Sequence, residues 1–510
     1  MKYQTIHSRK MRYGSMAVSL TVTLIAALVL LNVAFSTLAR HFNWYWDMTP
    51  EKSYTLSDTC RELLRDAIDD VNQKAAAAGG EPVTAEILFC EDYRNYETGS
   101  VGSYIYTTAH DLELAFPDTV SVSWFNCWVE KKRADELGVK ASTNVVLKLS
   151  NGQSRVFTQK EFFSFANGNT TSPVGYDGER ALATTLVSLM YADRPLACIT
   201  VNHDEIFYDY QLVYLLRDAG YNFSYIDLFR SEIPEECELL VCYNPNADFI
   251  DADGVADTSE VARVREFLAG GGNLAVFLES DTPVLPNLEA LLAEWGVSVE
   301  RAYDSANEMY FNCMVKDSSA SLTSDGFSVV GTYADAAAEV LAPMLERDYL
   351  PKVIFRDSTA FRAADGFTGG NGSYTNGTRT LTTLFTPSDN AELWANGSAQ
   401  PKGSDRPALM TLSSDSATGA HVLVLGSSDY ATEDYLQSAV FGNSDAVLCA
   451  LQAMGKEHLL LGLHYKPYST SAISSITTSQ TLHWTLWLSI VPAVLVPAVA
   501  ITVLVRRKNT

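Results

Sequence analysis

Positive charge is scarce in this sequence. Its 510 residues include 37 Lys and Arg against 61 Asp and Glu, which gives a formal net charge of −24. Proteins that bind nucleic acid need a basic surface that neutralises phosphates, and domains that lie on anionic lipid need the same. The charge balance therefore excludes a nucleic-acid partner and argues against a domain that lies on anionic lipid.

The common motifs of phosphate binding and nucleophilic catalysis are also missing. The glycine clusters at residues 270–272 and 369–372 lack the lysine that follows glycine in a phosphate-binding loop, so we expect no ATP hydrolysis. No G-x-S-x-G or G-x-C-x-G turn follows a predicted strand. We therefore predict a protein that is not an enzyme and needs no cofactor.

Cysteines are few, and none of the eight forms a C-x-x-C pair. Because zinc-ligand spacing is absent, we predict no metal site. Cys198 and Cys242 lie inside apolar runs, where a free thiol behaves as a small buried hydrophobe. A chain of this length does not need disulfides for stability, and the sequence leaves their pairing open.

Two long hydrophobic runs lie near the ends of the chain. Residues 16–38 and residues 482–505 contain no acidic residue, Lys or Arg, and each is long enough to cross a hydrocarbon core of about 30 Å. Basic residues lie on the outer flanks, in 1–15 and 506–510, which places both termini in the cytoplasm. The alternative for the first run is a cleaved signal peptide, although its length exceeds the usual apolar region of about 7–15 residues.

These runs predict a protein of the plasma (inner) membrane with two spans and one large extracytoplasmic region between them. Residues 43–165 begin with a helix for which Ser57 is the expected N-cap, and continue with strands. Asn151-Gly152 between two of these strands predicts a hairpin. We therefore expect a small α/β domain over 43–165.

Residues 178–300 alternate apolar strands with short amphipathic helices. This pattern predicts a doubly wound, mostly parallel sheet of flavodoxin- or amidotransferase-like type. Residues 301–407 are rich in Gly, Ser, Thr and Asn, and we expect an irregular insertion there. The α/β domain then returns over 408–455, and a polar linker, 456–481, leads to the second hydrophobic run.

Polar residues follow two of the predicted strands. In open α/β sheets, ligands bind at the carboxyl ends of the strands, and a histidine between two carboxylates can bind a ligand or shuttle a proton. The alternative is that these residues belong to ordinary loops that cap the following helices. The candidate ligand-binding residues are His203, Asp204 and Glu205 after one strand, and Ser427, Ser428 and Asp429 after the other.

Several segments, in order along the chain, carry a family likeness. DMTPEKSYTLSDTCRELL follows the first hydrophobic run, GERALATTLVSLM precedes a strand, and NHDE and HVLVLGSSDY follow later. Together they resemble the GldG-like family, auxiliary components of ABC transport systems linked to gliding motility in bacteria. The family often has glycine at the first position of the NHDE segment, where this chain has Asn202, while His203 and Glu205 are kept.

The resemblance implies an accessory subunit that works with a separate ABC ATPase and a membrane permease. Its ectodomain would look like a degenerate amidotransferase or intraflagellar-transport type domain without catalysis. We therefore expect a non-catalytic, membrane-anchored auxiliary subunit that binds exported substrate or cell-wall material or acts as a scaffold. The alternatives are an ectoenzyme of the hydrolase kind that uses His203, Asp204 and Glu205, and an extracellular ligand sensor.

Overall fold

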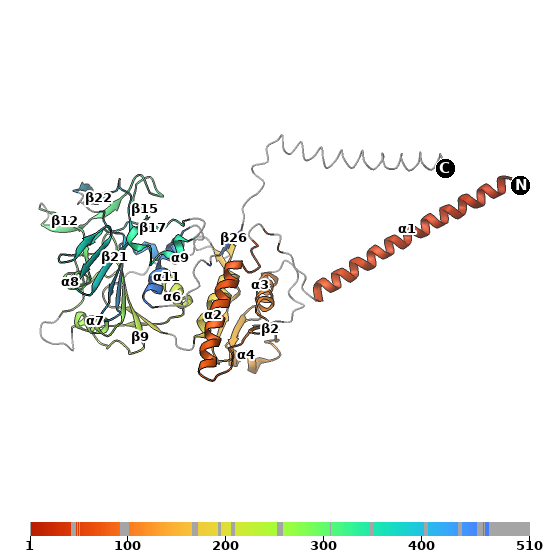
Figure 1. The fold of residues 1–510 in the computed structure, drawn as a ribbon, viewed down its shortest axis with the longest axis horizontal. Helices are drawn as coiled ribbons and strands as arrows, with labels where there is room; N and C mark the ends of the chain where they lie inside the picture. The colour runs from red at the N-terminus through yellow and green to blue at the C-terminus, as the bar shows by residue number, and fades with distance from the viewer. Residues whose placement is uncertain are drawn as a thin grey trace. The chain divides into compact units, whose positions relative to one another are not determined.

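The structure is a computed structural model that describes residues 2–41, 47, 49, 52–91, 101–165, 172–191, 195–205, 210–251, 259–305, 308–346, 350–401, 406–436, 441–455, 463 and 465–468. The chain divides into two compact units, Met1–Pro467 and Tyr468–Thr510, and of the second only Tyr468 is described. The first unit contains an N-terminal helix, an N-terminal lobe (52–191 with 465–467) and a C-terminal lobe (195–455) (Figure 1). Its architecture is mixed α/β, with parallel and antiparallel strands.

The first hydrophobic run forms helix α1 (Lys2–His41). Its segment Val18–Phe35 has a mean hydropathy of 2.4 and is not buried, so it is long and apolar enough to cross a membrane. The hydroxyls of Thr23 and Thr37 donate hydrogen bonds to carbonyls one turn earlier, at 2.9 and 2.7 Å, and so need no water. By length and composition this segment is either a membrane span or a signal sequence. The second predicted span, 482–505, lies outside the described residues.

The N-terminal lobe contains a four-stranded sheet in the order β2-β1-β3-β4. β1 pairs in parallel with β2 and antiparallel with β3, which pairs antiparallel with β4. The Ser57 side chain accepts a hydrogen bond from the Cys60 N–H at the start of α2, which confirms the predicted N-cap. The predicted hairpin joins β3 and β4, with Gly152 at φ +90°. The elements are α2 (Asp58–Ala77), β1 (Ala85–Phe89), α3 (Val101–Ala115), β2 (Val120–Trp124), α4 (Lys131–Leu137), β3 (Val145–Leu149), β4 (Ser154–Phe157), η2 (Gln159–Phe162) and α5 (Gly178–Met190).

A second, smaller sheet brings the end of the described chain back to this lobe. β6 (Pro173–Tyr176) pairs antiparallel with β5 (Phe163–Phe165) on one side and with β26 (Lys466–Pro467) on the other. The last described strand of the chain is therefore part of the N-terminal lobe.

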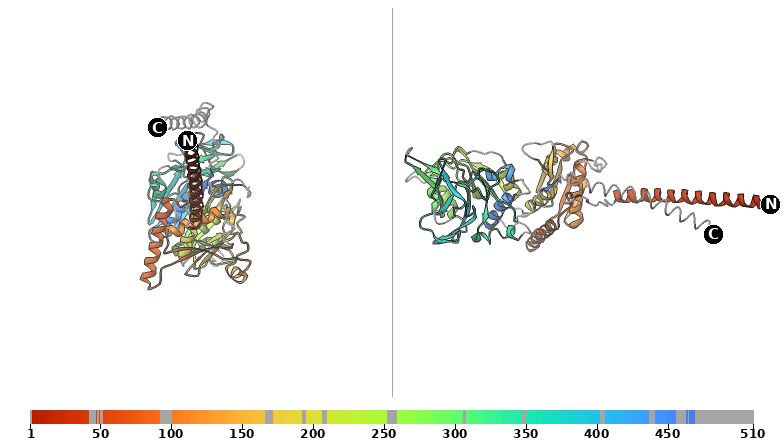
Figure 2. Two further views of the ribbon diagram at one scale, coloured as in Figure 1. Left: turned by 90° about the vertical axis from the view of Figure 1, so that its right-hand side faces the viewer. Right: turned by 90° about the horizontal axis from the view of Figure 1, so that it is seen from above.

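A ten-stranded sheet forms the centre of the C-terminal lobe, and one half of it is parallel. The order is β19-β20-β21-β24-β25-β10-β9-β7-β8, with β16 also paired to β21. The five strands from β25 to β8 are parallel, and helices contribute to the hydrophobic cores on both faces, so this half is doubly wound (Figures 1 and 2). The elements are β7 (Leu196–Thr200), α6 (Gln211–Asp218), β8 (Asn222–Ile226), β9 (Cys237–Tyr243), α7 (Glu260–Ala269), β10 (Asn273–Phe277), α8 (Pro286–Glu294), β25 (His421–Leu425) and α11 (Asn443–Ala453).

The other half of the sheet is antiparallel, which corrects the expectation of a mostly parallel sheet. Residues 301–407, expected as an irregular insertion, supply four of its strands. Asn371 and Gly372 have φ values of +52° and +84°, and they form the two-residue turn between β19 and β20. The polar, glycine-rich composition thus encodes hairpins. The strands are β16 (Thr332–Tyr333), β19 (Thr368–Gly370), β20 (Ser373–Asn376), β21 (Arg379–Thr386) and β24 (Met410–Asp415).

Short strand pairs and helices complete the C-terminal lobe. The small sheets are β11 (Val297–Val299) with β18 (Phe361–Ala363), β12 (Arg301–Asp304) with β13 (Met309–Asn312), β15 (Ser328–Val330) with β17 (Ile354–Arg356), and β14 (Met314–Lys316), β22 (Glu392–Ala395) and β23 (Ser398–Gln400). The short helices are η4 (Asp335–Ala337), α9 (Ala342–Leu345), η5 (Asp429–Ala431) and α10 (Glu433–Leu436).

Candidate functional site

The two predicted polar loops follow β7 and β25 at the same edge of the large sheet, but they do not meet. β9 and β10 lie between these strands in the sheet order. At about 4.8 Å per neighbouring strand, three steps separate the two strand ends by about 14 Å. Residues 203–205 and residues 427–429 therefore form two separate groups.

The loop after β7 turns through two residues in the left-handed backbone region. Asn202 has φ +79° and Asp204 has φ +52°. Asparagine tolerates this conformation better than most residues, so it can stand where the resembling family often has glycine. The side-chain amide of Asn202 donates to Asp227 Oδ2 at 2.6 Å. This turn directs His203 inward, where it is 2% exposed, and leaves Asp204 exposed.

The imidazole of His203 is held between two carboxylates. Its Nδ1 lies 3.0 Å from Glu205 Oε1, and its Nε2 lies 3.2 Å from Glu260 Oε2. The ring also packs on Phe249, with ring centroids 4.3 Å apart. Burial lowers the pKa of His203, but hydrogen bonds to Glu205 and Glu260 outweigh burial and raise it to about 9. At neutral pH the ring is therefore protonated, and each nitrogen donates to a carboxylate.

Each carboxylate is in turn fixed by the backbone. Glu205 accepts hydrogen bonds from the N–H of His203 at 2.8 Å and from the hydroxyl of Thr200 at 3.1 Å. Burial raises the pKa of Glu205, but the hydrogen bond from His203 and the backbone donors lower it overall. Glu260 is the first residue of α7 and accepts from the N–H of Ile250 at 2.7 Å. We call Glu205, His203, Glu260 and Phe249 the His203 cluster, which joins β7 to the N-terminus of α7.

This cluster offers little for acid–base chemistry or metal binding. Both ring nitrogens of His203 donate to buried carboxylates, so neither can accept a proton from a substrate. Glu205 and Glu260 contact opposite nitrogens of the ring and therefore do not face a common point. Within the described ranges, no group of three or more His, Cys, Asp and Glu side chains has the arrangement of a metal site.

The residues after β25 are engaged in the C-terminal lobe in a different way. Ser427 is fully buried and its hydroxyl donates to the carbonyl of Arg356 at 2.6 Å. The carbonyl of Ser428 accepts from the hydroxyl of Tyr243 at 2.7 Å. Asp429 forms an ion pair with Arg356 at 3.5 Å. These contacts join β25 to β9 and β17.

Sequence reasoning missed several polar residues at this edge. Asn244 follows β9, and its amide donates to Glu279 Oε2 at 3.0 Å, beyond the end of β10. Both side chains stand directly after apolar strands, which is the signal that identified His203. Glu260 gave no such signal, because an acidic residue in the first turn of a helix is ordinary.

A second cluster lies in the N-terminal lobe, where the two ends of the region between the predicted spans meet. The ammonium of Lys466 lies 2.6 Å from Glu179 Oε2 and donates to the carbonyl of Thr55 at 2.5 Å. Glu179 Oε1 accepts from both the N–H and the hydroxyl of Ser57, each at 2.6 Å. We call Ser57, Glu179 and Lys466 the Glu179 cluster.

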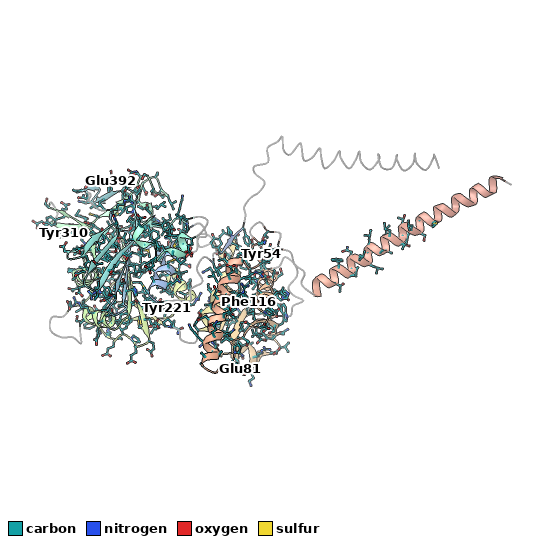
Figure 3. The ribbon with its side chains drawn as sticks, in the orientation of Figure 1. Tyr54, Glu81, Phe116, Tyr221, Tyr310 and Glu392 are labelled. Carbon is teal, nitrogen blue, oxygen red and sulfur yellow. The ribbon has the colours of Figure 1, made fainter. Side chains whose placement is uncertain are left out.

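Aromatic packing lies beside this cluster in sequence and in space. Tyr54, labelled in Figure 3, stacks on Tyr104 with ring centroids 4.0 Å apart and meets Tyr176 edge-on at 5.0 Å. Tyr176 is also the strand partner of Lys466 in the β6–β26 pair. Residues shortly after α1 and residues shortly before the second predicted span are thus fixed to the same point.

Comparisons with known proteins leave the family of this chain open. No family model matches it, and no curated protein matches it. It is similar to the N-terminal domain of mmIFT52, at 13% identity and a TM-score of 0.36 over 51% of this chain and 97% of that one. A ThuA-like protein from Bacteroides uniformis gives 12% identity and a TM-score of 0.29, over 52% and 93%. PurLQS from Thermotoga maritima gives 12% identity and a TM-score of 0.27, over 52% of this chain and 99% of that one. Similarities this distant carry no argument about function.

Proposed function

We propose that this chain is a non-catalytic, membrane-anchored auxiliary subunit of an ABC-type transporter in the plasma membrane of a bacterium. It acts as a scaffold or binds substrate or cell-wall material through its extracytoplasmic region. A separate ATPase and a membrane permease are its partners. The class of complex comes from the resemblance to the GldG-like family.

The observation that carries the proposal is the Glu179 cluster. Lys466 stands shortly before the hydrophobic run 482–505, and Ser57 shortly after α1. Their shared buried partner, Glu179, ties both ends of the intervening region to one lobe. Such a junction suits a region whose two ends enter the same membrane, with both termini in the cytoplasm, because it fixes the spacing of the spans.

The His203 cluster favours a scaffold over an ectoenzyme. Among the described residues at this edge, the histidine best suited to acid–base work has both nitrogens occupied by buried carboxylates. The parallel half of the large sheet fits a degenerate amidotransferase- or flavodoxin-like domain whose strand edge holds structural contacts in place of a reactive pair.

Purification from native membranes tests the proposal. The full chain, tagged and extracted in a mild detergent, should bring with it an ATP-binding subunit and a polytopic permease in fixed ratio. A variant that lacks residues 482–510 should lose both, while an exposed substitution such as Lys140→Gln should retain them. Recovery of the full chain alone would count against the proposal, as would turnover of a substrate by the isolated protein.

A further inference from the structure

One face of the four-stranded sheet in the N-terminal lobe is only partly covered. Helix α5 packs with α2, α3 and β3, and α3 also packs with β2. A separate hydrophobic cluster, which contains Leu88, Val146 and Ala134, lies under the short helix α4. Because α4 spans only seven residues, it leaves part of this second face uncovered.

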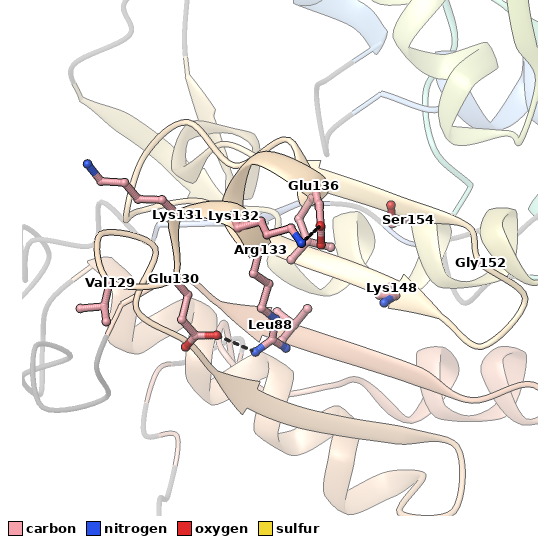
Figure 4. A pocket seen from close by; sticks show the side chains of 11 residues that line it. Leu88, Val129, Glu130, Lys131, Lys132, Arg133, Glu136, Lys148, Gly152 and Ser154 are labelled. Atoms are coloured by element: carbon pink, nitrogen blue, oxygen red, sulfur yellow. Dashed lines mark hydrogen bonds and ion pairs between the residues drawn. The ribbon is translucent and has the colours of Figure 1, made fainter.

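A cavity of about 740 Å³ opens beside α4 on this face (Figure 4). Leu88 of β1 contributes an apolar wall, and Lys148 of β3 and Ser154 of β4 contribute a polar one. Residues 129–133 and 136–137, in and before α4, complete the lining. The cavity therefore combines an apolar wall with polar and charged groups.

The lining is basic, in contrast to the chain as a whole. It contains four cations, of Lys131, Lys132, Arg133 and Lys148, and two carboxylates, of Glu130 and Glu136, so four minus two leaves a formal charge of +2. The whole chain carries −24. A local excess of positive charge of this kind attracts anions.

The ion pairs within the lining leave much of this charge available. Arg133 pairs with Glu130 at 3.4 Å, and Lys132 pairs with Glu136 at 3.8 Å, with the two side chains of the latter pair 93% and 66% exposed. Exposed pairs of this kind interact weakly. Within the described part of the chain, no carboxylate lies within 4.0 Å of Lys131 or Lys148.

Helix stability does not explain the basic residues of α4. Its first turn contains Lys131, Lys132 and Arg133 and no acidic residue. Cations near a helix N-terminus face the positive end of the helix dipole, which destabilises the helix. Arg133 has a structural partner in the ring of Phe125, 4.9 Å away, but Lys131 and Lys132 stand where helix stability alone would favour acidic or neutral side chains.

The turn before α4 presents two large apolar side chains to solvent. Trp128 is 66% exposed and Val129 is 78% exposed. The side-chain oxygen of Asn126 accepts hydrogen bonds from the N–H groups of both residues, at 3.0 and 3.2 Å, which fixes the turn. Exposed tryptophan beside lysine and arginine is typical of segments that contact the membrane interface.

The length of the chain keeps this lobe close to a membrane that α1 crosses. His41 ends α1, and the carbonyl of Lys52 accepts a hydrogen bond from the ammonium of Lys466 in the N-terminal lobe. The eleven residue-to-residue steps from His41 to Lys52 span at most about 40 Å, at about 3.6 Å for each step. The bilayer surface therefore lies within reach of the lobe.

We propose that the basic cavity of the N-terminal lobe binds the phosphate of an anionic phospholipid head group, with Trp128 and Val129 at the membrane interface. The proposal rests on the membrane anchoring in the proposed function, and it is independent of the ABC partners. Lys148 supplies a charge that is not already paired and Ser154 supplies a hydroxyl donor, while Lys131, whose side chain points away from both (Figure 4), adds unpaired positive charge at the rim. The contact would orient the lobe on the bilayer and would make its position depend on lipid composition.

A fluorescent label at position 129 tests this contact. All eight native cysteines are buried, so a thiol-reactive, environment-sensitive dye will mark Val129→Cys selectively. The purified full chain is placed in nanodiscs of phosphatidylcholine alone or with increasing phosphatidylglycerol. The emission should shift to the blue only as the anionic lipid rises. Lys131→Gln with Lys148→Gln should move the midpoint by about fivefold for each lysine, whereas Lys140→Gln with Lys160→Gln should not move it.

The outcomes separate this inference from the proposed function. An equal emission in both lipids, or a shift that survives the Lys131→Gln/Lys148→Gln change, overturns the lipid site, even if the ABC subunits still co-purify. A shift produced by soluble glycerol 1-phosphate in nanodiscs of phosphatidylcholine alone would assign the cavity to a free phosphate compound and overturn the membrane contact. A lipid-dependent shift that only the cavity lysines alter supports the proposal.

Discussion

The ammonium of Lys466 and the carboxylate of Glu179 lie 2.6 Å apart, and their side chains are 14% and 5% exposed. This pair joins the last described strand to the first turn of α5, and through Ser57 it also holds the N-cap of α2. Three segments that are remote in sequence therefore share one buried carboxylate. The stability of the N-terminal lobe therefore depends on contacts from both Ser57 and Lys466, which lie toward opposite ends of the chain.

Lys466→Met should destabilise the N-terminal lobe by about 3–5 kcal/mol, because it leaves the carboxylate of Glu179 buried without its partner. Urea unfolding of the full chain in detergent, followed by circular dichroism, measures the change. Lys140→Met, at an exposed lysine of the same lobe, is the control and should stay within about 0.5 kcal/mol. Adding Glu179→Gln should recover part of the loss, since it removes the unpaired charge. A Lys466→Met protein as stable as the control would contradict a structural role for the pair.

His203→Phe should destabilise the C-terminal lobe by about 3–5 kcal/mol, because Glu205 and Glu260 would remain buried without the cation between them. The same urea measurement applies, with Asp204→Asn as the neighbouring control. Asp204 is exposed and asparagine tolerates its left-handed backbone, so that variant should stay close to wild type. If His203→Phe were as stable as wild type, the carboxylates of Glu205 and Glu260 would have to be stabilised by contacts other than those to His203.

Stability should fall with rising pH above neutrality. The ordinary pKa of histidine is 6.5, and in the fold the pKa of His203 is raised to about 9. The stabilisation from its charged form is therefore complete below about 6.5 and is lost as the pH passes through about 9. The pKa of Glu205 is lowered, so its contribution to stability is present above its ordinary pKa of 4.5 and is lost in acid.

Thermal melts from pH 5.5 to 9.5 should show the decline above neutrality in wild type and a flatter profile in His203→Gln. Parallel profiles for the two proteins would rule out His203 as the group responsible.

Much of the fold follows from local signals in the sequence. Buried apolar strands such as 196–200 and 273–277, each followed by an amphipathic helix, predict the parallel half of the large sheet. The antiparallel half is harder to predict, because three of its strands, β16, β19 and β20, have only two to four residues and its turns lie in a polar segment. Asn371-Gly372 carries the same hairpin signal as Asn151-Gly152, and the surrounding glycines hid it.

The clusters depend on contacts that one sequence cannot specify. His203 and Glu260 are 57 residues apart, and Lys466 and Thr55 are 411 apart. Their proximity is decided by the strand order and by the return of the chain to β6, neither of which periodicity encodes. The end of a parallel strand was a good indicator of polar residues, but it did not reveal whether their partners would be a ligand or other side chains.

The turn at Asn202 provides a last test, because it separates backbone geometry from side-chain chemistry. Asn202→Val should destabilise the C-terminal lobe by about 1–2 kcal/mol, since a β-branched residue fits φ +79° poorly. Asn202→Gly should stay near wild type, because glycine adopts this conformation freely and loses only an exposed hydrogen bond to Asp227. Asn222→Val, at the exposed start of β8, is a matched control in extended backbone and should cost little. The urea midpoints of the three variants show whether the left-handed backbone or the side-chain hydrogen bond determines stability at position 202. If the glycine variant were as unstable as the valine variant, the bond to Asp227, and not the left-handed backbone, would be what this position requires.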